Sequence, residues 1–187
     1  MCPSAKTLSV NVLLFLGVLR VMKLAIDNRR IDKPRIFFSI HPGDPKDHHP
    51  VYNFMAKDHR IRPEVITSEI MSGTEMVYGM DMIIQSMSTI GKQAACQRIP
   101  VIEFVTDLAM KHHEAVSGPS WWLSDCGASS MVREDVVLFA SEIFNFVEDR
   151  TMVRKMQKAA QEKMLPRPER CGVGVETMRK TVLEFLS

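Results

Sequence analysis

Three hydroxyl side chains, Ser86, Ser88 and Thr89, follow a short apolar run at residues 82–84. A short apolar run bounded by polar residues is typical of a buried strand, and the small residues after Thr89 favour a helix. The hydroxyls therefore stand between a strand and a helix N-terminus, where free backbone N–H groups and the helix dipole favour a negative charge. This position predicts phosphate binding, and a simple N-cap by Ser88 or Thr89 is the plainer alternative.

The same segment predicts the fold class. The helix expected over 90–97 is followed by a second apolar run at 101–105, and a helix between two strands is the repeating unit of a parallel sheet. Other apolar runs are read as strands, at residues 10–16, 35–40, 65–67 and 128–132. Together they predict an α/β protein: a single doubly wound, Rossmann-like domain over residues 1–187 with a parallel sheet.

Helical periodicity occurs between and after these strands. Helices are predicted at residues 18–28, 52–56, 68–78, 133–147, 150–164 and 176–186. Residues 106–127 lack clear periodicity and are predicted to form a long loop. That loop holds Trp121 and Trp122, an adjacent pair typical of an interface or a ligand platform.

Composition narrows the function classes. The 187 residues are 45% apolar and 25% charged with a net charge of +2, which gives no polyelectrolyte argument for nucleic acid. The four cysteines form no CxxC pair, so zinc ribbons and disulfides are not indicated and a reducing cytoplasm is expected. The apolar stretch at 8–22 is too short and too interrupted for a membrane span. Neither GxGxxG nor a P-loop occurs, and the histidines match no metal-ligand spacing.

The segment 80–102 resembles the donor-nucleotide half of GT-B glycosyltransferases, whose usual pattern is A-D-hydrophobic-S-x-x-S-T-x-x-x-E-A-x-x-x-G-x-P-V-I. Met80-Asp81 stands in the place of Ala-Asp, and Ser88-Thr89 in the place of Ser-Thr. Gln93 stands where the family usually has glutamate, and Pro100-Val101-Ile102 closes the motif. The resemblance implies that the donor phosphates lie at the turn that carries Ser88 and Thr89.

A second resemblance lies at His41-Pro42, after the strand expected at 35–40. Such a pair occurs in GT-B enzymes that use CMP- or CDP-linked donors, including bacterial sialyltransferases and teichoic-acid glycerophosphotransferases. It implies that His41 contacts the donor phosphate or assists departure of the nucleotide, which makes His41 the candidate catalytic residue. Gly43 and Asp44 follow in the same turn, where Asp44 is expected to orient His41 or to bind a ribose.

Two carboxylates are expected at the end of the strand at 101–105. Glu103 and Asp107 flank this end and are predicted to accept hydrogen bonds from sugar or ribose hydroxyls. The predicted substrate-binding set is therefore Gly43, Asp44, Ser86, Ser88, Thr89, Gln93, Glu103 and Asp107. No metal ligand and no separate cofactor are predicted.

The resemblance implies a nucleotide-sugar-dependent glycosyltransferase that uses a UDP-, CDP- or CMP-linked donor as substrate. It covers only the donor half, so a partner is expected, either an acceptor-binding protein half or a second copy of this chain. A cytoplasmic protein is expected, at the membrane surface through such a partner. Two alternatives stay open: a relative of the nucleotide-sugar 2-epimerases, and a donor-binding or interaction module without catalysis.

Overall fold

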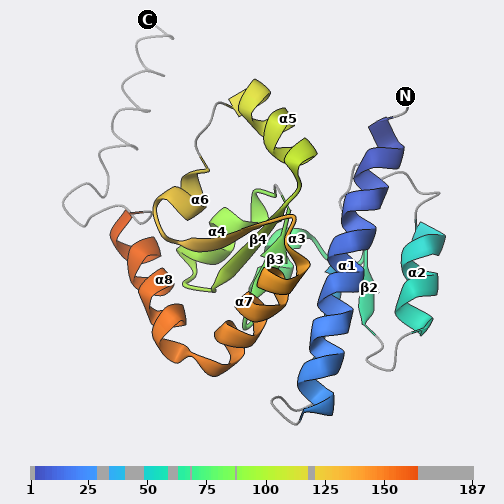
Figure 1. Cartoon of the computed structure of the whole chain (residues 1–187), viewed down its shortest axis with the longest axis horizontal. Coiled ribbons are helices and arrows are strands. Elements are labelled where there is room, and N and C mark those ends of the chain that lie inside the picture. The colour runs from blue at the N-terminus through green and yellow to red at the C-terminus, as the bar shows by residue number, and fades with distance from the viewer. Residues whose placement is uncertain are drawn as a thin grey trace, which may run out of the picture.

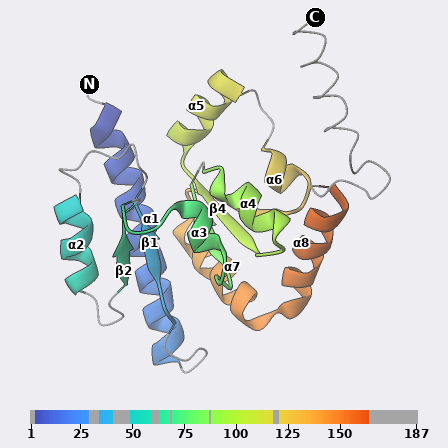
Figure 2. The same ribbon diagram turned by 180° about the vertical axis from the view of Figure 1, so that it is seen from behind.

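The computed structural model describes residues 3–28, 34–40, 49–58, 63–67, 69–86, 88–117 and 121–163 (Figures 1 and 2). Its helices are α1 (Pro3–Asp27), α2 (His49–Asp58), α3 (Gly73–Val77), α4 (Ile90–Cys96), α5 (Asp107–Ser117), α6 (Trp122–Asp125), α7 (Val136–Glu148) and α8 (Arg150–Lys163). Its strands are β1 (Phe37–Ser39), β2 (Glu64–Ile66), β3 (Ile83–Gln85), β4 (Val101–Val105) and β5 (Ser129–Arg133).

Every strand pair is parallel, as the sequence predicts. β1 pairs with β2, and β3, β4 and β5 form a second sheet in that order. The two strands expected on either side of the helix at 90–97 are direct neighbours, because Ile84 of β3 pairs in register with Ile102 of β4. The α/β class with parallel sheets and a Rossmann-like arrangement is therefore confirmed.

Helices cover both faces of the β3–β5 sheet. All five residues of β4 are buried, as expected for a central strand packed on both sides. Ile102 and Phe104 join a cluster with apolar residues of α1 and α7, while Val101 joins a second cluster with α4 and α6. The alternation of side chains along β4 thus separates two apolar layers. The carboxyl ends of β3, β4 and β5 lie at one edge because the three strands are parallel.

The predicted strand at 10–16 is wrong, because these residues lie inside the long helix α1. α1 is packed on two sides: Leu14 and Val18 face the cluster that contains α7, whereas Phe15 and Leu19 face β1, β2 and α2. Two adjacent apolar stripes leave few polar positions in the sequence, so the helical period is hidden and the segment resembles a strand. α1 therefore joins the β1–β2 pair to the main sheet (Figure 1).

The long loop predicted at 106–127 is also wrong, since the described part of it contains α5 and α6. α5 begins after Thr106, whose Oγ1 accepts a 3.1 Å hydrogen bond from the N–H of Ala109 and so caps the helix. Trp121 is buried, with its ring 4.3 Å from that of His113, and so does not offer an exposed contact surface. The side chain of Trp122 lies outside the described residues.

Smaller differences concern helix boundaries. The helix predicted from Ser68 starts at Gly73, where Ser72 is the N-cap and forms a capping box with Glu75. The helices predicted around 52–56, 133–147 and 150–164 are confirmed as α2, α7 and α8. The helix predicted at 176–186 lies outside the described residues.

No helix in the described part of the chain combines the length and the apolar character that crossing a bilayer requires.

Candidate functional site

The candidate site is the edge at which β3, β4 and β5 end. In a parallel sheet the carboxyl ends of neighbouring strands meet at one edge, where α/β proteins bind their ligands. Ser86 and Ser88 follow β3, Thr106 and Asp107 follow β4, and Glu134 follows β5. The fold therefore brings several of the predicted residues to one edge, together with residues that the sequence did not indicate.

At the turn between β3 and α4, the start of the helix is held by the chain itself. The Ser88 hydroxyl accepts a 3.3 Å hydrogen bond from the N–H of Ile90, and Gln85 Oε1 accepts one of 2.7 Å from the N–H of Gly91. Thr89 is exposed and makes no side-chain cap. Two helix N–H groups are thus occupied, while the Ser88 hydroxyl keeps its proton for a further acceptor.

Glu103 lies beneath this turn rather than at the surface. It is only 4% exposed; its Oε1 accepts from Gln85 Nε2 at 3.0 Å, and its Oε2 accepts from Ser129 Oγ at 2.5 Å. The carboxylate therefore connects the three strands and fixes Gln85, which in turn holds Gly91. Glu103 is placed to support the turn, with both oxygens engaged inside the fold.

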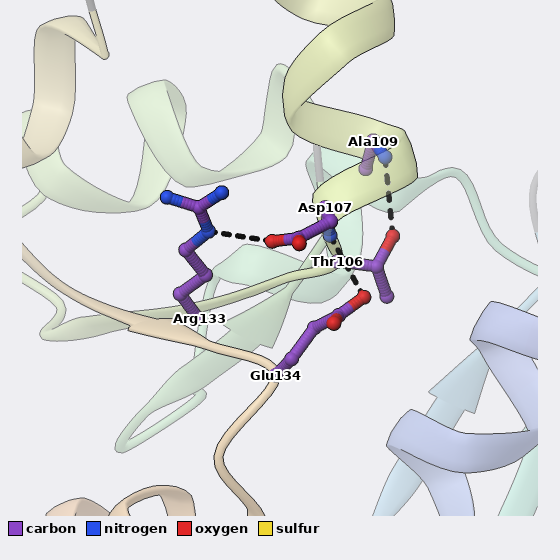
Figure 3. Close-up of polar contacts among 5 residues, drawn as sticks. All are labelled: Thr106, Asp107, Ala109, Arg133 and Glu134. Atoms are coloured by element: carbon purple, nitrogen blue, oxygen red, sulfur yellow. Dashed lines mark hydrogen bonds and ion pairs between the residues drawn. The ribbon is translucent and has the colours of Figure 1, made fainter.

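Asp107 lies at the exposed edge, in the first turn of α5 (Figure 3). Its Oδ1 is 2.6 Å from Nε of Arg133, and both side chains are more than half exposed. The hydrogen bond and the charge of Asp107 raise the pKa of Arg133 above its usual value. The bond fixes one carboxylate oxygen, so the other remains able to accept a hydrogen bond from a ligand hydroxyl.

Glu134 completes this edge, although the sequence pattern does not indicate it as a site residue. Its Oε1 accepts a 2.8 Å hydrogen bond from the N–H of Asp107 (Figure 3). Its own N–H donates to the carbonyl of Val105. The backbone of Glu134 has a φ of +46°, in the left-handed region that residues other than glycine rarely adopt. Such outliers are often found at functional sites.

A small hollow opens beside this cluster. Its volume is about 150 Å³, and it lies between α1, the end of β4 and the start of α7. Its lining residues are Gly17, Phe104, Thr106, Glu134, Val136 and Phe139. The hollow thus has mainly apolar walls with two polar side chains, a composition that is usual for small-molecule sites.

Of the remaining predicted site residues, the structure describes only Gln93. Gln93 is exposed on α4, one turn after Thr89. His41, Gly43 and Asp44 lie outside the described residues, so their predicted roles stay predictions. Within the described residues, no three His, Cys, Asp or Glu side chains are grouped as a metal site requires.

Arg133, Glu134 and Gln85 were missed because their partners are distant in sequence. A partial signal existed for Gln85, since a polar amide at the end of the apolar run 82–84 must find hydrogen-bond partners when it is buried.

No protein-family model matches this chain, and no curated protein or solved structure matches it either.

Proposed function

We propose that this chain is the donor-binding domain of a nucleotide-sugar-dependent glycosyltransferase of GT-B type. The observation that carries the proposal is the turn between β3 and α4. The Ser88-Thr89 pair of the family-like motif lies there, at the carboxyl edge of a parallel sheet. This edge is where Rossmann-like domains bind nucleotides.

In this proposal the hydroxyls of Ser88 and Thr89 donate hydrogen bonds to the phosphates of a UDP-, CDP- or CMP-linked donor. The Ser88 hydroxyl is oriented by the N–H of Ile90, which leaves its proton for a phosphate oxygen. Thr89 is exposed beside it. Because two helix N–H groups are already occupied, the hydroxyls rather than the backbone supply most of the contact.

In this proposal the Asp107 carboxylate accepts a hydrogen bond from a hydroxyl of the ribose or of the transferred sugar. Arg133 fixes its Oδ1, so the second oxygen is held in place to accept a hydrogen bond. In this proposal His41 assists departure of the nucleotide, and the acceptor is supplied by a second protein half or by another copy of the chain. Transfer by the purified chain alone, acting as a monomer, would contradict the need for a partner.

Calorimetric titration with UDP, CDP and CMP tests the proposal. Losing a hydrogen bond to a charged group reduces affinity by about ten- to a hundredfold. The double variant Ser88→Ala with Thr89→Val is therefore expected to bind at least one of these nucleotides that much more weakly than the wild type. Binding of the matching nucleoside should change much less.

The matched control is Ser141→Ala with Thr74→Val, which changes the same residue types at exposed positions of α7 and α3. The control should keep wild-type affinity, and circular dichroism should show that both variants are folded. If the wild type binds none of the three nucleotides, the proposed function is wrong. If the wild type binds but Ser88→Ala with Thr89→Val binds equally well, only the phosphate assignment is wrong.

A further inference from the structure

The hollow beside Glu134 has the size of a single ring. Its volume is about 150 Å³, and an apolar protein cavity of roughly that volume accommodates one benzene molecule. Phe104 and Phe139 contribute to its wall, with ring centroids 5.0 Å apart. A purine with its two fused rings would require a larger space.

Gly17 keeps the hollow open on the side of α1. A Cβ atom built at Gly17 would lie 3.4 Å from the Phe139 ring, so any longer side chain would project toward the space between the helix and that ring. Glycine is also a poor helix former in the interior of a long helix such as α1. Local helix preference therefore does not account for this glycine.

The two polar side chains of the hollow offer opposite hydrogen-bonding groups. Thr106 is buried, and its hydroxyl oxygen accepts from the N–H of Ala109, which leaves its proton available for another acceptor. One carboxylate oxygen of Glu134 accepts a hydrogen bond from the N–H of Asp107, and the second oxygen remains an acceptor. The hollow thus presents one donor and one anionic acceptor above apolar walls.

We infer that this hollow binds the pyrimidine base of the nucleotide, and this inference rests on the proposed function. The ring fills the apolar space, a ring carbonyl or nitrogen accepts from Thr106, and an amino or imino N–H donates to Glu134. Cytosine and uracil both carry such an adjacent acceptor and donor, whereas inorganic phosphate and sugars lack the flat apolar ring. The hollow thereby selects bases by size.

The experiment measures binding of CMP, UMP, AMP, GMP and inorganic pyrophosphate by calorimetry. The test variants are Gly17→Leu, which fills the hollow, Thr106→Val, which removes its donor, and Glu134→Gln, which removes the anionic acceptor. Each should weaken binding of CMP or UMP about tenfold or more. None should change pyrophosphate binding, which depends on Ser88 and Thr89. Thr106→Ser should restore affinity because it keeps the hydroxyl.

The matched controls are Thr74→Val on α3 and Glu162→Gln on α8, both at exposed positions away from the hollow. They should bind as the wild type does. Thermal unfolding identifies any variant that does not fold. If Gly17→Leu does not fold, two single-variant comparisons still test the proposal: Thr106→Val against Thr106→Ser, and Glu134→Gln against the wild type.

The outcomes separate the two proposals. If the wild type binds pyrimidine nucleotides and all the folded hollow variants bind them equally well, the base site is wrong while the proposed function stands. If AMP or GMP binds as tightly as CMP and loses affinity in the same variants, selection by ring size is wrong. If the wild type binds no nucleotide, both proposals are wrong.

Discussion

Glu134 Oε1 accepts a 2.8 Å hydrogen bond from the backbone N–H of Asp107, which joins the turn after β5 to the turn after β4. The bond is made from a backbone with a φ of +46°. The left-handed conformation costs about 1–2 kcal/mol for a residue with a Cβ atom. The hydrogen bond to the first turn of α5 offsets part of this cost, since it satisfies an N–H group that has no partner within the helix.

The first prediction compares two substitutions of Glu134. Glu134→Ala removes the hydrogen bond and keeps the strained backbone, whereas Glu134→Gly removes the same bond but relieves the strain. We expect the alanine variant to be less stable than the wild type and the glycine variant to be more stable than the alanine variant by about 1 kcal/mol. Urea unfolding gives the three free energies, and a glycine variant less stable than the alanine variant would contradict this account.

The second prediction concerns the buried carboxylate of Glu103. Glu103→Leu leaves two donors, Gln85 Nε2 and Ser129 Oγ, without their acceptor. Each unsatisfied buried group costs about 1–3 kcal/mol, so the free energy of unfolding should fall by at least about 2 kcal/mol. For Glu103→Gln the free energy of unfolding should fall less, because the new amide oxygen can accept from Gln85 while the amide nitrogen donates to Ser129. Equal losses in the two variants, measured by urea unfolding, would show that hydrogen bonding does not determine the effect.

The sequence predicts the central unit well, because its local signals agree. Short apolar runs at 82–84 and 101–105 and the small residues between them match the parallel pair β3–β4 and the helix α4. The sequence fails where a segment packs on two sides. α1 buries Leu14 against one layer and Phe15 against another, so its apolar pattern carries no clear period.

For the candidate site, the sequence predicts which residues follow strands but not which residues meet. Asp107 was expected at the strand end and lies there, exposed at the edge. Its contact with Arg133 depends on the register of β4 and β5, which joins Val105 to Arg133. Register arises from the packing of whole strands, so this contact between distant residues has no local signature.

The third prediction compares two helical glycines. A Cβ at Gly91 would lie 2.3–2.6 Å from the side-chain amide of Gln85, which cannot shift without losing its hydrogen bonds to Glu103 and to the N–H of Gly91. Gly91→Ala should therefore destabilise the protein by about 1–3 kcal/mol. Gly17→Ala meets the Phe139 ring at 3.4 Å, an ordinary contact, and should stabilise α1 by about 0.5–1 kcal/mol. Thermal and urea unfolding measure both, and effects of the same sign would contradict this reasoning.

The fourth prediction concerns pH and the capping box of α3. The hydroxyl of Ser72 donates a hydrogen bond to the Glu75 carboxylate, and the backbone N–H of Ser72 donates a second. These two bonds, the hydroxyl bond having the larger effect, lower the pKa of Glu75 below its usual value. A lowered folded-state pKa means that the unfolded state binds a proton more readily. The resulting stabilisation is fully present above the ordinary glutamate pKa and is lost as the pH falls through the lower folded-state pKa.

Urea unfolding of the wild type and of Glu75→Gln across this acidic range measures the effect. The difference in free energy of unfolding between the two should be largest near neutral pH and should shrink as the pH falls, because glutamine carries no titrating proton. Ser72→Ala removes the hydroxyl donor, so this single variant should show a weaker pH dependence of stability than the wild type. In a protein that already carries Glu75→Gln, adding Ser72→Ala should not change the pH dependence. A difference that grows toward acid pH would have the opposite sign, and the capping box would not be the source of the stabilisation.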